Sequence, residues 1–152
     1  MMRRALIYGL LAGGGAAAWT MAEFMLGFHT TRADVGRYTG FVGLVFPVAA
    51  IILGVRQARR AKGGLSFVQG LTEGLAMTGV FAVLGCLFLW LYYAAVNPGF
   101  FEQMAARGQT VTLGGQLATV LVSSLVLGLL ISLLAAALLR RPHAEGSRAV
   151  SA

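Results

Sequence analysis

Four apolar runs, each long enough to cross a lipid bilayer as a helix, constrain this chain more than any other feature. The hydrocarbon core of a bilayer is about 30 Å thick, which an α-helix crosses in roughly 20 residues. Within it every backbone polar group needs an internal partner, and a helix supplies one. We therefore predict an all-α, integral membrane four-helix bundle formed by one domain over residues 1–140. The predicted spans are residues 5–28, 38–55, 71–96 and 113–139.

The composition favours a membrane protein over a soluble domain. Of the 152 residues, 58% are hydrophobic and only 11% are charged, whereas soluble domains carry about 25% charged residues. Too few polar side chains remain to cover a surface that faces water. The net charge of +7 would suggest nucleic-acid binding in a soluble chain. In a membrane protein the placement of the charges matters more, and we expect no nucleic-acid partner.

The basic residues fall unequally on the two sides of the predicted bundle. Nine of them lie on the side that holds both ends of the chain and the loop between the second and third spans, and three lie on the other. Lys and Arg concentrate on the cytoplasmic side of membrane proteins. We therefore predict that both termini are cytoplasmic and that residues 141–152 form a disordered cytoplasmic tail. The loop residues expected to contact anionic lipid headgroups are Arg56, Arg59, Arg60 and Lys62.

A helix start is predicted where the basic loop ends. Ser66 followed three residues later by Gln69 matches a capping box, and Glu73 comes one turn further along. We expect Glu73 to lie in the headgroup zone near Arg59, Arg60 and Lys62, as an interfacial side chain with a structural role. A functional role for it, together with Glu23, is the alternative.

Glu23 is the deepest charge in the predicted spans. An ionisable side chain inside a span is costly and is a functional candidate by default. We expect Arg37 to be its partner, with Arg32 as the next choice. An interhelical ion pair, a proton or cation site and a contact with a partner protein are three open interpretations. At helical spacing Glu23 shares a stripe with Gly15, Trp19 and Gly27.

Small residues recur at every fourth position in the first and last spans. Such seams let helix backbones approach closely in lipid. We expect them to pack the bundle internally, with a homodimer interface as the alternative. Pro47 is expected to kink the second span near its middle, and the spacing of Phe100, Phe101 and Met104 predicts a short interfacial helix. The seam residues are Gly9, Gly13 and Ala17, and Ser124, Gly128, Ser132 and Ala136.

The chain lacks the residue sets that carry common chemistries. It has no G-x-x-x-x-G-K-[ST] loop and no H-E-x-x-H pair, and its one cysteine and two histidines cannot make an internal disulfide or a zinc site. We therefore expect no catalytic residues, no cofactor and no enzymatic activity.

Four segments carry a resemblance to a known family. They are ALIYGLLAG at residues 5–13, FPVAAIILGVRQAR at 46–59, GGLSFVQGLTEGL at 63–75 and YYAAVNPGFFEQM at 92–104. In this order they resemble the bacterial membrane-protein family called domain of unknown function 4199. The resemblance covers residues 5–139. It implies a four-span protein of the bacterial inner membrane with a motif at Ser66, Phe67 and Gln69, and it implies no activity.

Our leading hypothesis is a non-enzymatic membrane protein that self-associates or serves as an accessory subunit of a larger membrane assembly. The small-residue seams and the absence of catalytic sets support it. The alternative is a transporter or channel-like protein in which Glu23 binds a proton or cation.

Overall fold

The computed structural model describes residues 1–29 and 38–140, and every regular element in them is helical. The all-α prediction is therefore confirmed. The Arg37 partner predicted for Glu23 and the predicted tail over residues 141–152 lie outside the described residues. The elements are α1 (Met2–Met25), the 3₁₀-helix η1 (Gly40–Leu44), α3 (Val45–Lys62), α4 (Phe67–Leu91), the π-helix η2 (Tyr92–Val96), α5 (Phe100–Ala106) and α6 (Leu113–Leu139).

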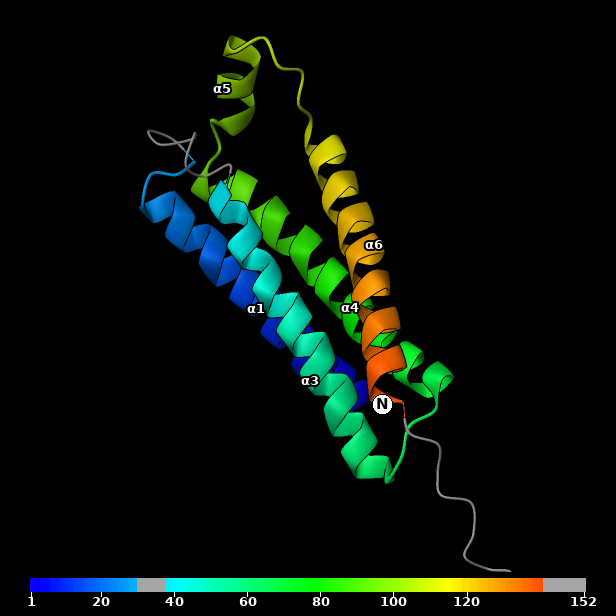
Figure 1. Cartoon of the computed structure of the whole chain (residues 1–152). Coiled ribbons are helices and arrows are strands. Elements are labelled where there is room, and N and C mark those ends of the chain that lie inside the picture. Colours follow the sequence, from blue (N-terminus) through cyan, green and yellow to red (C-terminus); the bar gives the residue numbers. More distant parts are fainter. Residues whose placement is uncertain (30–37, 141–152) are drawn as a thin grey trace, which may run out of the picture.

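The four long helices form an elongated bundle in which α1, α3, α4 and α6 run side by side (Figure 1). Helix α5 stands at one end of this bundle and the N-terminus lies at the other. Each long helix is apolar enough to cross a membrane, yet only 22% to 33% of each apolar stretch is buried within the protein. The remaining apolar side chains face outward, which is the pattern of a protein solvated by lipid.

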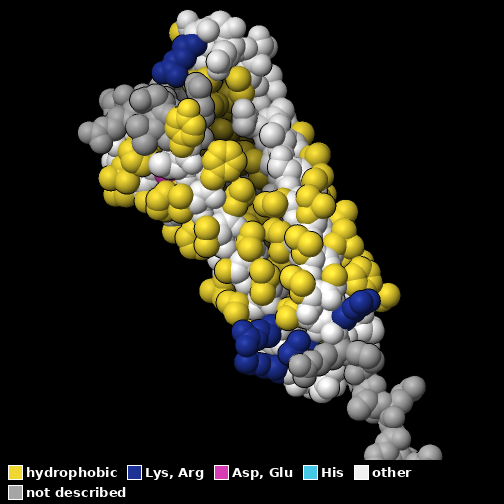
Figure 2. Space-filling model, viewed as in Figure 1, with side chains coloured by type: hydrophobic (Ala, Val, Ile, Leu, Met, Phe, Trp, Pro, Cys, Tyr) yellow, Lys and Arg dark blue, Asp and Glu magenta, His cyan; other side chains and the backbone are white. Residues whose placement is uncertain are grey.

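The buried core lies between α1, α3, α4 and α6 toward the N-terminal end of the bundle. Three of its eight residues are alanines, which let the helices approach closely at those positions, and the others are larger aliphatic side chains. Hydrophobic side chains also cover the outer surface along the bundle, and Lys and Arg side chains gather where α3 ends (Figure 2). The core residues are Ala5, Ile51, Val55, Ala58, Leu65, Met77, Ile131 and Ala135.

The second span differs from its predicted form. Its α-helical part begins at Val45 and continues to Lys62, so Pro47 lies in the first turn and not near the middle. A proline in the first turn costs little, because the N–H groups there have no partner within the helix. Pro47 therefore does not interrupt a continuous α-helix near its middle, and it follows the point where the 3₁₀ turn Gly40–Leu44 changes to α3. Gly63, with φ of 68°, ends the helix.

The loop after the third span contains the expected short helix. Helix α5 covers Phe100–Ala106, and its aromatic side chains contact Tyr93 at the end of the preceding span. The ring centroids of Tyr93 and Phe100 are 4.7 Å apart in a stacked arrangement. Aromatic packing therefore fastens α5 to the end of the bundle.

Candidate functional site

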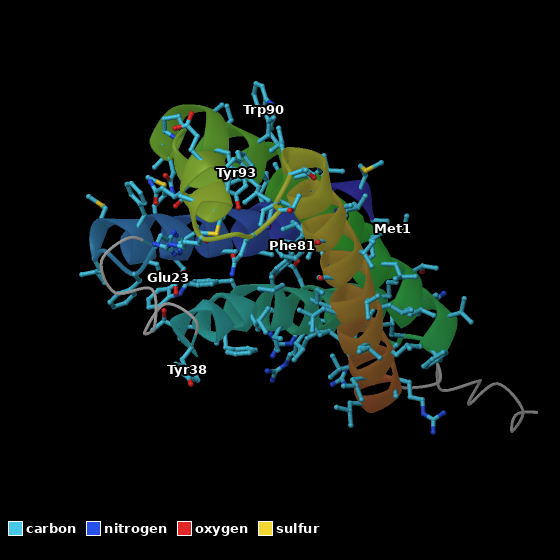
Figure 3. All side chains as sticks on the ribbon, turned by 90° about the horizontal axis from the view of Figure 1, so that it is seen from above. Met1, Glu23, Tyr38, Phe81, Trp90 and Tyr93 are labelled. Atoms are coloured by element: carbon cyan, nitrogen blue, oxygen red, sulfur yellow. The ribbon has the colours of Figure 1, made fainter. Side chains whose placement is uncertain are left out.

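Glu23 lies in the last turn of α1 and is only 4% exposed. Figure 3 labels it at the opposite end of α1 from Met1. The helix ends two residues later, and Gly27 turns the chain back with φ of 77°. A residue with a Cβ would be strained in this left-handed conformation. The turn at Gly27 returns His29 to the side chain of Glu23.

His29 connects Glu23 to the third span. Its Nε2 lies 3.6 Å from Oε2 of Glu23, which is within ion-pair range when the imidazole is protonated. Its Nδ1 lies 2.7 Å from the hydroxyl of Tyr92. One imidazole ring therefore joins a carboxylate and a phenol that stand 69 positions apart in the chain. These three side chains form what we call the Glu23 cluster.

Tyr92 is placed by an unusual turn of backbone. The α-helix α4 gives way at Tyr92 to the π-helix Tyr92–Val96, which closes with a 2.8 Å hydrogen bond from the Asn97 N–H to the Tyr92 carbonyl. Pro98 follows, and the residue before a proline disfavours helical backbone. Single π-turns of this kind are frequent at functional sites. Tyr92 is only 4% exposed at this end of the bundle.

Aromatic rings enclose the Glu23 cluster. Phe24 packs edge-on against Tyr92 with a centroid separation of 5.8 Å and lies 6.5 Å from the His29 ring. Tyr93 packs against the other side of Tyr92 at 5.4 Å. Rings in these arrangements exclude water from the Glu23 carboxylate, and this raises the free-energy cost of burying a charge there.

Two polar atoms at this end of the bundle are buried without a hydrogen-bond partner among the described residues. They are Oε1 of Glu23 and Nδ2 of Asn97, and Asn97 lies against the Tyr92 phenol. A buried carboxylate oxygen without a partner is costly. A bound ligand with a hydrogen-bond donor would reduce that cost.

Glu73 occupies the other end of the bundle, and its side chain is fully buried. Its Oε1 accepts from Nη2 of Arg4 at 2.9 Å and from Nζ of Lys62 at 3.2 Å. The expected neighbour Lys62 is present. The expected neighbour Arg59 instead donates to the Leu139 carbonyl at 3.5 Å, at the end of α6.

The placement of Glu73 follows from the start of α4. The predicted capping box is present, because the Gln69 N–H donates to Oγ of Ser66 and the Ser66 N–H donates to Oε1 of Gln69, each at 3.2 Å. Glu73 follows on the first buried turn. It is an ion-paired side chain inside the protein, and its place in the headgroup zone stays a prediction.

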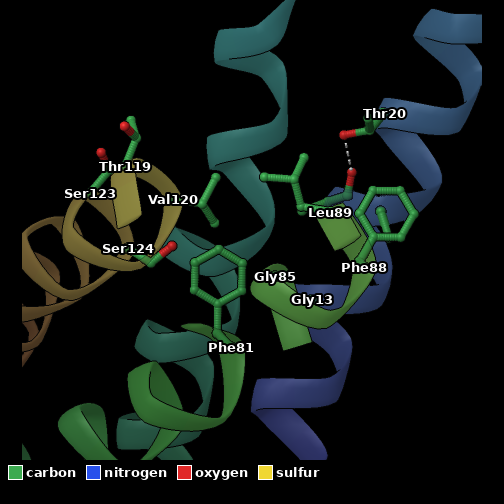
Figure 4. A pocket seen from close by; sticks show the side chains of 12 residues that line it. Gly13, Thr20, Phe81, Gly85, Phe88, Leu89, Thr119, Val120, Ser123 and Ser124 are labelled. Atoms are coloured by element: carbon green, nitrogen blue, oxygen red, sulfur yellow. Dashed lines mark hydrogen bonds between the residues drawn. The ribbon is translucent and has the colours of Figure 1, made fainter. Parts of the chain in front are cut away.

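A groove of about 270 Å³ opens between α1, α4 and α6. Small residues of α1 and α4, Gly13, Ala16 and Gly85 among them, line it. Figure 4 shows Thr20 on α1 and hydroxyl residues of α6 on either side of the α4 side chains. The hydroxyls of Thr20 and Thr119 donate to carbonyls of their own helices at 3.0 and 2.8 Å, while Ser123 and Ser124 add two more hydroxyls.

Comparison with known proteins identifies a family for this chain. A family model described as protein of unknown function (DUF4199) matches residues 7–141. The chain belongs to the DUF4199 family. Neither a curated protein nor a solved structure matches the chain. The resemblance drawn from the four sequence segments is therefore confirmed, while the bacterial inner membrane stays a prediction for this DUF4199 member.

The seam residues of this DUF4199 protein face other helices of the same chain. A Cβ added at Gly13 would lie 3.1 Å from the Leu84 side chain, and one added at Gly9 would collide with Val80. In the last span, Gly128 stands against Thr78, while Ser124 and Ser132 are buried. These positions therefore lie inside the bundle, on α1/α4 and α4/α6 contacts.

Sequence reasoning named Glu23 but missed both partners of its cluster. His29 could have been found from the sequence, because a glycine such as Gly27 lets the chain reverse and bring a nearby histidine back to the end of the helix. Tyr92 gave no such signal, since its position depends on a π-turn.

The described residues contain no group of three His, Cys, Asp or Glu side chains that could hold a metal ion. Of the predicted headgroup residues, Arg56 and Arg60 are exposed at the end of α3, close to Lys62.

Proposed function

We propose that this protein is a non-enzymatic accessory subunit of a bacterial inner-membrane assembly, and that the α1/α4/α6 groove receives a transmembrane helix of its partner. The groove is the observation that carries the proposal. Its partly exposed small residues, Ala16 and Gly85, allow a backbone to approach closely. The hydroxyls of Thr20 and Thr119 already donate within their own helices, which leaves the serine hydroxyls of α6 for a bond across helices. An acyl chain offers no acceptor for these serine hydroxyls, whereas a partner helix can supply one.

The shape of the groove favours a different protein over a second copy of this chain. In a two-fold dimer the same surface meets itself, and a concave surface cannot fill its own copy. A head-to-tail contact with another face of a second copy would instead require a ring or an open filament of copies. A helix of a different protein fills the groove without either arrangement. The basic end of the bundle would face the cytoplasm, because nine of the twelve Lys and Arg residues fall on that side.

Filling the groove is expected to remove the partner. A Cβ at Gly85 would lie 3.4 Å from Val120, so the leucine of Gly85→Leu would project into the groove. Gly79→Leu is the matched control, because Gly79 is on the same helix and a Cβ there meets nothing within 4 Å. We expect a partner present in stoichiometric amount with the wild type and with Gly79→Leu, and reduced at least tenfold with Gly85→Leu. The measurement is native mass determination after extraction into lipid-polymer discs.

A photo-crosslinking residue at Ser123 gives the complementary measurement. A crosslink from Ser123 to the same foreign protein, absent from the same probe placed at the exposed Leu138, supports the proposal. A crosslink to a second copy of the chain, or a partner that Gly85→Leu and Gly79→Leu retain equally, contradicts it.

The Glu23 cluster favours a second candidate function, proton or cation binding. The unpartnered Oε1 of Glu23 is an acceptor in an enclosed setting, and His29 and Tyr92 extend from the carboxylate as a line of groups that exchange protons. Intramembrane carboxylates in such lines mark ion and proton paths.

Neutralising Glu23 is expected to abolish any flux that depends on it. In proteoliposomes with a pH gradient, Glu23→Gln should reduce proton flux at least tenfold if this function holds. Glu102→Gln is the control, because Glu102 is an exposed carboxylate of α5 at the same end of the molecule. Equal flux in wild type and Glu23→Gln, with both proteins folded, rules out the proton role.

A further inference from the structure

The basic end of the bundle contains a cavity that the accessory function does not use. It has a volume of about 350 Å³ and lies between the beginning of α1 and the last turns of α3. Two arginines that are adjacent in the sequence contribute to its wall, together with one side-chain amide. Its lining residues are Met1, Arg3, Arg4, Ile7, Gln57 and Ala61.

The charges around this cavity leave it positive. Glu73 is the acidic side chain beside it, and this carboxylate is shared by Arg4 and Lys62. Arg3 makes no ion pair within residues 1–29 and 38–140. Arg4 and Lys62 therefore share one carboxylate while Arg3 adds a further cation at the wall, so a net positive charge is available to an anion.

Arg4 is held in place at the wall of the cavity by an ion pair. Its Nη2 is bound to Glu73 at 2.9 Å, which fixes the guanidinium at the wall of the cavity. The Arg4 side chain also lines the cavity and is 22% exposed. A guanidinium held in this way is suited to a phosphate oxygen, because such charge-assisted bonds are strong and directional.

The cavity also lies at the level where headgroups would be. Leu6 and Leu10, one and two turns beyond the arginines on α1, are exposed apolar side chains, and Figure 2 shows the hydrophobic surface adjoining the basic end. Ile7 and Ala61 in the cavity wall are apolar as well. A ligand there would meet cations on one side and an acyl-chain environment on the other.

We propose that this cavity binds the phosphate group of an anionic phospholipid, held by Arg3 and Arg4 and by the amide of Gln57. Basic pockets between transmembrane helices on the cytoplasmic side are known to hold such headgroups. The site is separate from the α1/α4/α6 groove and does not depend on a partner protein.

The test compares two exposed arginines at the basic end of the bundle, one that lines the cavity and one that does not. Arg3→Gln removes a lining residue, whereas Arg60→Gln removes an exposed arginine that does not line it. The full chain in phosphatidylcholine discs is titrated with phosphatidylglycerol, and bound lipid is counted by native mass spectrometry. We expect one retained phosphatidylglycerol for wild type and Arg60→Gln, and about tenfold weaker binding for Arg3→Gln.

Inorganic phosphate, added to discs that contain only phosphatidylcholine, separates the two sources of the same group. A rise in the thermal midpoint of the wild type, absent in Arg3→Gln, shows that free phosphate occupies the cavity; a response to phosphatidylglycerol alone assigns it to lipid. Both results support a phosphate site. Equal weakening by Arg3→Gln and Arg60→Gln, or no preference for phosphatidylglycerol over phosphatidylcholine, overturns it. Unchanged thermal midpoints of both variants in phosphatidylcholine show that both are folded.

Discussion

Gly128→Leu is expected to force α6 away from α4 and to destabilise the bundle by about 3 kcal/mol, the upper part of the range for overpacking a core. Gly128 is buried against Thr78, and even a Cβ at this position would collide with the Thr78 side chain. One turn away the same seam pairs Ser132 with Gly74, so a shift at Gly128 disturbs that contact too. Unfolding in detergent titrations or the thermal midpoint in lipid discs measures the loss.

Gly114→Leu is the matched control for this change. Gly114 is at the start of the same helix, and a Cβ there meets nothing within 4 Å. Thr78→Ala removes two of the three Thr78 atoms that a Cβ at Gly128 would meet, so it should restore part of the stability of the Gly128→Leu protein. If Gly128→Leu and Gly114→Leu unfold alike, the α4/α6 seam does not hold the bundle together.

The spans could be predicted because one physical length controls them. The thickness of the hydrocarbon core sets how many apolar residues a helix needs, and that requirement is visible in the sequence without any knowledge of tertiary contacts. Helix ends were less predictable, since they depend on local backbone. Pro47 shows the difficulty, because its effect changes from a kink to a tolerated first-turn residue when the helix begins at Val45.

The packing positions were predictable from spacing, but their partners were not. A repeat of small residues says that a backbone comes close, and it does not say which one. Gly9 and Gly13 face Val80 and Leu84 of α4, a pairing that only the three-dimensional arrangement reveals. The two ion-pair partners of Glu73 also differ in how predictable they were. Lys62 is 11 positions away and was expected, whereas Arg4 is 69 positions away and was missed.

Within residues 1–29 and 38–140, the two buried carboxylates, Glu23 and Glu73, have different partners. Glu73 has two cations on its Oε1, which offset much of the cost of burying its charge, although its Oε2 has no hydrogen-bond partner among the described residues. Glu23 has one imidazole at 3.6 Å and an oxygen with no partner among the described residues. The difference between them is therefore in their cations, because Glu73 is paired at 2.9 and 3.2 Å and Glu23 has only an imidazole at 3.6 Å among the described residues. Glu23 is the better candidate for binding, since an ion-paired carboxylate would have to give up its cations first.

Glu73→Ala is accordingly expected to destabilise the protein strongly without affecting binding at the Glu23 end. Removing one partner of a buried ion pair costs about 3–5 kcal/mol because it leaves uncompensated charge. Here we expect about 3 kcal/mol, since Arg4 and Lys62 retain 22% and 37% of their side-chain exposure and water screens them in part. The thermal midpoint in lipid discs is the measurement.

Two further variants separate the ion pair from the mere loss of a side chain. Lys62→Ala should cost less than Glu73→Ala, because Arg4 still neutralises Glu73 and the lysine is the more exposed of the two cations. Glu102→Ala removes an exposed carboxylate from α5 and should leave the midpoint nearly unchanged. If Glu73→Ala is as stable as Glu102→Ala, Arg4 and Lys62 find enough solvent without the carboxylate. The Glu73 pair would then fix where α1 begins against α4 without adding to the stability of the bundle.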